Sequence, residues 1–198
     1  MLYKLAHIIK DKFSFLWEAI EWGNASLFYM LHKKQLAKVN KILEGISPKY
    51  IIRLATNNDV DILVHFFREQ PEGAFKFFRP HEFDEKAVRK VVNNKAFLTF
   101  LVLSDNELVG YFFLRAFVNG KCFRGKMVHK DLQGRGIAKL MGVAMTKVSQ
   151  HLRMFGSISS ENYASMASAK ASNEIKIHKT LENGYYYIEF LPKIKIEK

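Results

Sequence analysis

Residues 129–142 read HKDLQGRGIAKLMG, and this stretch decides the fold. It carries glycines on both sides of an arginine, directly before a run whose apolar residues recur with helical spacing. The first amides of a helix have no partner within the helix, and its N-terminus carries partial positive charge. Because glycines let an anion approach the backbone closely, the stretch predicts an anion-binding loop at the junction of a strand and a helix.

The same residues exclude two widespread phosphate motifs. A dinucleotide fingerprint would need a third glycine at position 139, where the chain has Lys139. A P-loop would need Gly-Lys-Ser or Gly-Lys-Thr, and neither follows here. Taken alone, the loop therefore indicates an anion site without naming the ligand.

Alternating strand and helix patterns surround the loop. We expect strands at 50–55, 121–129, 154–159 and 184–191, a β-hairpin at 96–118, and helices at 56–69, 81–94, 136–153 and 162–182. The segment 71–80, PEGAFKFFRP, is a proline-bounded loop that is dense in phenylalanine and basic residues. Gly125 lies inside an expected strand, which indicates either a bulge or a close neighbour.

Residues 1–48 predict a helical extension to the domain of residues 49–198. Apolar residues recur at helical spacing in two runs, which Gly23-Asn24 interrupts, so the pattern indicates a helical hairpin. Its aromatic and basic residues suit peripheral contact with a membrane surface or a partner. The competing interpretation is that the hairpin packs on its own domain or on a second copy in a homodimer.

The composition is that of a folded domain: 198 residues, 48 % of them hydrophobic. The net charge is 31 − 19 = +12, which attracts nucleic acid, an anionic membrane or phosphorylated small molecules, or simply forms a solvated surface.

Cys122 is the sole cysteine, so an intrachain disulfide and a cysteine metal cluster are excluded, and we expect a cytoplasmic location. The histidines show no metal-ligand spacing, so no metal site is expected. The N-terminus lacks the pattern of a signal peptide, and no uncharged apolar run is long enough to span a membrane.

With Val128 before it, the segment Gln133-Gly134-Arg135-Gly136-Ile137-Ala138 resembles motif A of the GCN5-related N-acetyltransferases (GNAT), Gln/Arg-x-x-Gly-x-Gly/Ala. The order of strands and helices over roughly residues 50–191 is also similar to that family, whereas residues 1–48 fall outside it. The resemblance implies an α/β (α+β) fold, with a mixed, mostly antiparallel twisted sheet flanked by helices and the N-terminal helical hairpin as an extension.

The resemblance also implies acetyl-CoA as a co-substrate. In such enzymes the loop amides bind the pyrophosphate, the preceding strand pairs with the pantetheine arm, and an asparagine after the next strand binds the arm. Two asparagines compete for that role: Asn162, close to Ser165, and Asn173, eleven residues before Gly184. The implied cofactor-binding residues are Met127, Val128, Gln133, Gly134, Arg135, Gly136, Ile137, Ala138, Asn162, Ser165 and Asn173.

The usual acid and base of the family are missing from their positions. Thr180 stands four residues before Gly184, where the family often has a tyrosine that protonates the thiolate. The expected strand 121–129 offers Cys122, Arg124, Lys126 and His129 in place of the common glutamate. The alternatives that remain are His129, Glu161, Tyr163 and His178.

These features predict an acetyl-CoA-dependent N-acetyltransferase acting on a small amine. Arg79 in the basic loop and the overall charge favour an anionic acceptor, such as an amino sugar linked to a nucleotide. The alternative is a non-catalytic module with the same fold that binds acyl-CoA or docks to a partner. Nucleic-acid binding is disfavoured because the chain shows no recognised motif for it.

Overall fold

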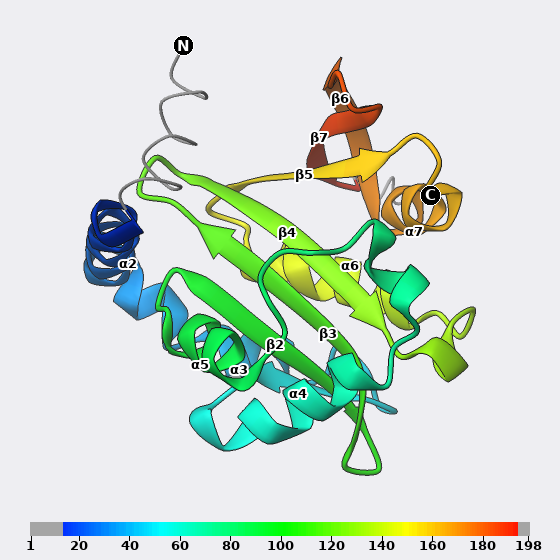
Figure 1. Ribbon diagram of the computed structural model, residues 1–198, viewed down its shortest axis with the longest axis horizontal. Coiled ribbons are helices and arrows are strands. Elements are labelled where there is room, and N and C mark those ends of the chain that lie inside the picture. Colours follow the sequence, from blue (N-terminus) through cyan, green and yellow to red (C-terminus); the bar gives the residue numbers. More distant parts are fainter. Residues whose placement is uncertain (1–13, 194–198) are drawn as a thin grey trace.

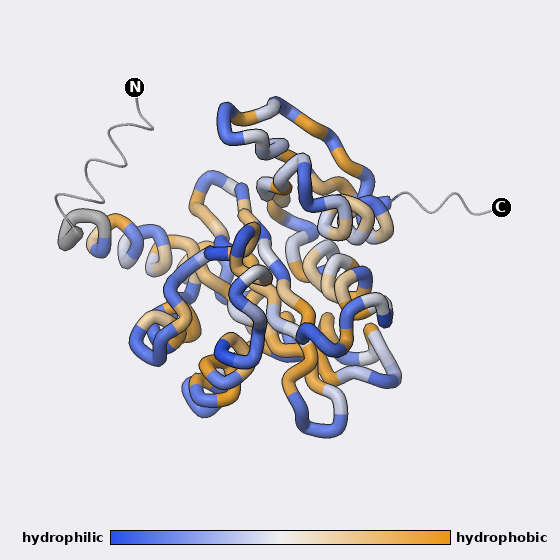
Figure 2. The backbone as a smooth tube through the Cα atoms, turned by 45° about the vertical axis from the view of Figure 1, so that its right-hand side comes forward, coloured by the Kyte–Doolittle hydropathy of each residue, from blue (hydrophilic) through white to orange (hydrophobic). Residues whose placement is uncertain are grey.

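The computed structural model describes residues 14–193 of the chain (Figure 1). The helices are α2 Ser14–Leu36, α3 Val39–Leu43, α4 Val60–Arg68, α5 Glu85–Asn93, α6 Ile137–Val148 and α7 Tyr163–Ser172. The strands are β1 Ile51–Leu54, β2 Phe97–Ser104, β3 Glu107–Ala116, β4 Lys121–Val128, β5 Arg153–Ser159, β6 Asn173–Thr180 and β7 Tyr185–Pro192. Hydrophobic residues gather along the central strands, while the loops are hydrophilic (Figure 2).

Within the described residues, the strands form one seven-stranded sheet in the order β1-β2-β3-β4-β5-β7-β6. All neighbouring pairs are antiparallel except β4 and β5, which are parallel. Helices flank this mixed, mostly antiparallel sheet (Figure 1), so the expected fold class is confirmed. Pairing between β4 and β5 covers only 121–123 against 153–155, and beyond it the two strands diverge.

Strands β2 and β3 are buried on both faces, which explains why their sequences read as continuous apolar runs. On one face, Phe100 stacks on Phe112 with ring centroids 4.5 Å apart, within the larger core cluster that includes α6. On the other face, Phe97 stacks on Phe113 at 4.6 Å, within the cluster formed with α4 and α5. The two clusters fix the central strands between helical layers, and β4 lies at their edge.

Gly125 provides space for aromatic rings and does not form a bulge. The register between β3 and β4 runs without a shift from Gly110–Val128 to Ala116–Cys122. A Cβ at Gly125 would lie 2.4 Å from the ring of Phe113 and 2.9 Å from that of Phe78. The close-neighbour alternative is therefore confirmed, and the expected bulge is wrong.

The expected long helix at 162–182 is wrong beyond Ser172. From Asn173 the chain continues as β6, which returns against β7 in an antiparallel hairpin closed by Gly184 at a φ of 77°. Ile175 and Ile177 are β-branched and alternate along β6, and this spacing suits a strand better than a helix face. The hairpin adds an edge to the sheet beside β5.

The expected turn at Gly23-Asn24 is also wrong, because α2 runs through both residues. The Asn24 side chain has partners at the end of β3 and in the turn that follows it: Nδ2 donates to the Ala116 carbonyl at 3.0 Å, and Oδ1 accepts from the Val118 amide at 3.2 Å. Phe28 on the same helix is fully buried in the core cluster. The first run of the predicted hairpin lies mostly in residues 1–13, outside the described part.

Helix α2 also carries apolar side chains outward, among them Trp22, which is 74 % exposed. Among the described residues, no helix combines the length and the apolar character needed to cross a membrane.

Candidate functional site

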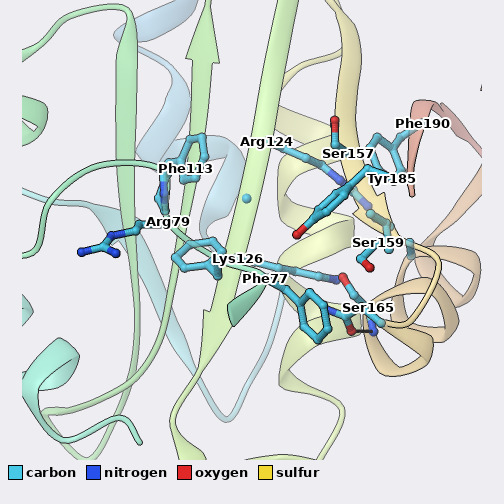
Figure 3. Close-up of a pocket in the computed structure, with 17 residues that line it drawn as sticks. Phe77, Arg79, Phe113, Arg124, Lys126, Ser157, Ser159, Ser165, Tyr185 and Phe190 are labelled. Carbon is cyan, nitrogen blue, oxygen red and sulfur yellow. Dashed lines mark hydrogen bonds between the residues drawn. The ribbon is translucent and has the colours of Figure 1, made fainter. Parts of the chain in front are cut away.

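A cavity of about 270 Å³ lies where β4 and β5 separate (Figure 3). Residues from β3, β4, β5, α7 and β7 and from the segment 77–80 form its walls. The lining residues are Phe77, Phe78, Arg79, Pro80, Phe113, Arg124, Gly125, Lys126, Gly156, Ser157, Ile158, Ser159, Asn162, Ser165, Ala169, Tyr185 and Phe190. This set contains three cationic side chains and several hydroxyls, but no aspartate, glutamate or histidine.

The glycine loop leads from the end of β4 into α6. Gly134 and Gly136 have φ values of 77° and 82°, in the left-handed region that favours glycine. Gly136 is the N-cap of α6 and offers no side chain, so the first amides of the helix are not capped from within. Ile137 is buried in the core and anchors the loop, while Gln133 and Arg135 are exposed. The loop therefore has uncapped amides at the start of α6 and an exposed arginine beside them.

Lys126 connects β4 to both helices behind the cavity. Its Nζ donates to the Ala138 carbonyl at 2.6 Å, in the first turn of α6, and to Ser168 Oγ of α7 at 2.7 Å. Burial, and to a lesser extent repulsion from Arg124, lowers the pKa of Lys126 to about 7. Its charge therefore changes near neutral pH.

Arg124 lies two residues before Lys126 on the same strand. It donates from Nη1 to Asn173 Oδ1 at 2.9 Å, and its guanidinium lies 3.4 Å from the ring centroid of Phe190. Burial lowers the pKa of Arg124, but a guanidinium stays charged at neutral pH. The cavity wall thus holds a permanent positive charge.

Polar groups on β5, β7 and α7 face these cations. Tyr185 projects from β7 with its hydroxyl directed toward β4 (Figure 3). Its strand register pairs it with Ser159, so both residues lie at the cavity. Asn162 caps α7, because its Oδ1 accepts from the Ser165 amide at 2.9 Å.

Two of the four predicted catalytic residues project away from this cavity. His129 follows β4, and its ring nitrogens lie 3.5 Å from Glu69 and 3.8 Å from Asp131, at a second cavity that Glu69 also lines. Glu161 lies on the surface, with a carboxylate oxygen 3.1 Å from Lys76 Nζ. Neither side chain lines the cavity between β4 and β5.

The other two catalytic candidates are also elsewhere. Tyr163 is 80 % exposed at the start of α7. His178 Nε2 donates to the Glu189 carboxylate at 2.8 Å, and the same carboxylate accepts from Arg153 Nε at 2.8 Å. These bonds lower the pKa of Glu189 to about 2, with the Arg153 hydrogen bond as the largest cause. The group holds β5, β7 and β6 together.

The predicted cofactor residues divide between the cavity, the loop and the interior. Asn162 and Ser165 line the cavity, whereas Asn173 is 1 % exposed and bonds to Arg124, Thr146 and the Leu191 carbonyl. Met127 is buried in the core cluster opposite α6, and Val128 pairs with Gly110 of β3. The structure therefore brings Asn162 together with the cavity and keeps Asn173 inside the protein.

Sequence reasoning missed Tyr185, Ser157 and the combined placement of Arg124 and Lys126. Arg124 and Lys126 are charged residues inside an expected strand that also contains apolar residues, and this pattern is a signal of a polar site. Tyr185 gave no such signal, because it stands in a run of three tyrosines and only the strand register selects it. In the described residues, no group of histidine, cysteine, aspartate and glutamate is placed to hold a metal ion.

No protein-family model matches the sequence, and no curated protein matches it either. Solved structures do resemble it. The GNAT domain of S. lividans PAT aligns with a TM-score of 0.61 and 17 % identity over 70 % of this chain and 88 % of that one. Ribosomal-protein-S5-alanine acetyltransferase from Vibrio fischeri aligns with a TM-score of 0.60 and 12 % identity over 77 % and 97 % of the two chains. The aminoglycoside acetyltransferase AAC(6')-Ib, in complex with coenzyme A and kanamycin, aligns with a TM-score of 0.57 and 11 % identity over 73 % and 95 %. The chain therefore has the GNAT fold.

Proposed function

We propose that this chain is an acetyl-CoA-dependent N-acetyltransferase that acts on a small amine. The observation that carries the proposal is the divergence of β4 from β5 beside the glycine loop. Beyond Phe123, the edge of β4 that faces away from β3 has no partner strand among residues 14–193, so it can pair with an extended ligand. The known proteins with this fold support the proposal, because their names describe acetyltransferases and one is a complex with coenzyme A.

The loop and the cavity fit the two ends of such a ligand. Amides of residues 133–138 would hold the pyrophosphate, because they are uncapped and their glycines allow close approach. The backbone of Met127 and Val128 would contact the pantetheine arm, and Asn162 and Ser165, which line the cavity at the start of α7, would face it. Acetyl-CoA would supply an acetyl group on a thioester that reacts directly with an amine.

We assign the remaining chemistry to the cavity wall. The Tyr185 hydroxyl is directed toward β4 and would donate its proton to the departing sulfur. The described lining residues include no carboxylate and no imidazole that could take the proton of the amine. We propose that the amine binds as the free base and releases this proton to water after it attacks the thioester.

An anionic amine, such as an amino sugar linked to a nucleotide, is the acceptor class that the charges favour. Arg79, Arg124 and Lys126 line the cavity, and no acidic side chain joins them there. Arg79 belongs to the segment 77–80 at the cavity wall, but its exposed guanidinium is directed away from β4 and pairs with Glu82 at 3.3 Å, so Arg124 and Lys126 supply the charges inside the cavity (Figure 3). Such a positive lining attracts anions and repels cationic amines.

The test is a steady-state assay of thiol release from acetyl-CoA with matched amines: amino sugars, amino-sugar nucleotides, amino acids and polyamines. We expect thiol release that depends on the amine and is fastest with an anionic one. Preference for polyamines would refute the anionic acceptor. Tight binding of acetyl-CoA without thiol release for any amine would refute the enzyme, and would favour the alternative of an acyl-CoA-binding module.

A further inference from the structure

Two cationic side chains on β4 face the same way. Arg124 and Lys126 are two residues apart in a strand, so their Cα atoms are about 7 Å apart and their side chains leave the same face. Their contacts agree with this, since Arg124 reaches Asn173 at the start of β6 and Lys126 reaches α6 and α7. Both residues line the cavity, as Figure 3 shows.

Neither cation has a counter-ion in the part of the chain that the structure describes. The ion pairs found between residues 14 and 193 include neither Arg124 nor Lys126. Burial lowers the pKa of both groups, which shows that the protein disfavours these charges where they stand. A buried charge is costly unless something pairs with it, so a cavity that retains two such groups is suited to an anionic ligand.

The two side chains also have hydrogen-bonding capacity left over. Arg124 has five N–H donors, and one hydrogen bond, to Asn173, engages it within the described residues. Lys126 has three donors when it is protonated, and two are taken by Ala138 and Ser168. A carboxylate offers about four lone-pair sites and suits the planar fork of an arginine.

We propose that Arg124 and Lys126 form a subsite for a carboxylate carried by the substrate. This rests on the proposed function as an N-acyltransferase: the carboxylate belongs either to the amine acceptor, with acetyl-CoA as the donor, or to the acyl group, in which case the donor is a carboxyacyl-CoA and not acetyl-CoA. A phosphate is better matched by the glycine loop, where several free amides converge at a helix N-terminus. The cavity wall offers one guanidinium and one ammonium, which fit a single carboxylate.

The first experiment asks whether the carboxylate belongs to the acyl group. Binding of two unreactive thioethers, S-propyl-CoA and S-(2-carboxyethyl)-CoA, is measured by calorimetry at pH 6.5 on the full chain, with CoA alone as the reference. The two thioethers differ in the terminal carboxylate. If the acyl group is the source, the carboxylated thioether binds about tenfold more tightly or better.

The second experiment asks whether the carboxylate belongs to the amine acceptor. Binding of butylamine and of 4-aminobutyrate is measured on the full chain, with and without saturating CoA. If the acceptor is the source, 4-aminobutyrate binds at least about tenfold more tightly than butylamine. Equal affinity within each pair, in both experiments, would overturn the proposal.

Variants then locate the carboxylate. Arg124→Gln and Lys126→Met should each reduce the preference to within about threefold. Arg68→Gln on α4 and Lys147→Met on α6 are exposed and should keep it, although they remove the same charges. If Arg124→Gln does not fold, Arg124→Lys replaces it, since it keeps the charge and loses the planar fork. If the Arg124→Gln and Lys126→Met variants both keep the preference for the carboxylated ligand, the subsite is also overturned.

The same measurements distinguish failure of the proposed function from failure of the carboxylate subsite. If CoA and both thioethers do not bind, acetyl-CoA is not the co-substrate, and the amine experiment without CoA still decides the subsite. If CoA binds but neither pair shows a preference, the subsite fails and the proposed function stands.

Discussion

The Nζ of Lys126 donates to the carbonyl of Ala138 at 2.6 Å and so ties β4 to the first turn of α6. The strand and the helix that carry the two ends of the candidate site are thus joined by one buried ammonium. Burial disfavours the charged form of Lys126, so we expect this lysine to serve ligand binding and not the stability of the fold.

We therefore expect Lys126→Met to stabilise the protein at pH 7 while it weakens binding of a carboxylate. Methionine has a similar length and removes the buried charge, and replacing buried charges by apolar groups is often neutral or stabilising. The expected gain is about 1 kcal/mol in the free energy of unfolding, measured by urea denaturation. Lys147→Met on the exposed side of α6 serves as the control and should leave stability unchanged. A loss of stability would mean that the ammonium is a structural tie.

The same lysine predicts a pH dependence of stability. Its pKa is lowered from 10.5 to about 7 in the folded protein, so between these values the unfolded chain binds more protons. The free energy of unfolding of the wild type should therefore rise with pH from about 7 to about 8.5 relative to Lys126→Met. The range stops there because the buried Cys122 thiol, whose pKa is raised to about 12, acts in the opposite direction above pH 9. The groups that face the ammonium are Arg124, the Ala138 carbonyl and the Ser168 hydroxyl. If the free energies of unfolding of the wild type and of Lys126→Met changed in parallel with pH, the lowered pKa of Lys126 would be contradicted.

Gly136→Ala should weaken CoA binding by about tenfold or more. Its φ of 82° is strained for alanine, and the change distorts the amides that would hold the pyrophosphate. Gly120→Ala is the matched control, because Gly120 has a φ of 76° in the turn between β3 and β4, away from the loop. Both variants should lose about 1 kcal/mol of stability, and Gly136→Ala alone should lose affinity in calorimetry. Equal CoA affinity for the two variants would exclude the loop as the pyrophosphate site.

Tyr185→Phe should lower kcat by about a hundredfold and leave KM for acetyl-CoA nearly unchanged. The variant removes the hydroxyl that would donate a proton to the sulfur and keeps the ring in place. The neighbouring Tyr186 packs against the main core on the opposite face of β7, so Tyr186→Phe serves as the control and should retain kcat. If kcat of Tyr185→Phe stayed within a factor of three of the wild type, another proton donor would have to act.

Asn24→Ala should lower the free energy of unfolding by about 2 kcal/mol. It removes two hydrogen bonds that join α2 to the end of β3 and to Val118. Gln35→Ala on the same helix changes an exposed side chain and should have little effect. Urea denaturation followed by circular dichroism measures both variants. If Asn24→Ala were also neutral, α2 would be an appendage whose order does not contribute to the stability of the domain.

The sequence predicted the sheet and the loop because both depend on local patterns. The apolar runs of β2 and β3 and the glycines at 134 and 136 need no distant partner to be recognised. The errors arose where a distant contact decides the local structure. Asn24 looked like a turn residue, but its partner at Ala116 lies 92 positions away and keeps it helical. The chain after Ser172 looked like more helix, but pairing with β7 makes it a strand.

The candidate site was likewise predictable only where it depends on a local sequence pattern. The glycine loop is contiguous in sequence, so a motif was sufficient to find it. The cavity draws on β3, β4, β5, β7, α7 and the segment 77–80, which meet only after folding. Sequence proximity pointed to His129 and Tyr163, whereas the sheet register places Tyr185 opposite Ser159 at the cavity.

The separation of β4 from β5 also has a kinetic signature. Amides of residues 124–128 that point away from β3 have no strand partner within the described structure, so they should exchange their protons with solvent far faster than those of residues 121–123. A ligand that pairs with β4 would slow that exchange. Deuterium uptake along this one strand would then show where the ligand begins and ends, before its chemistry is known.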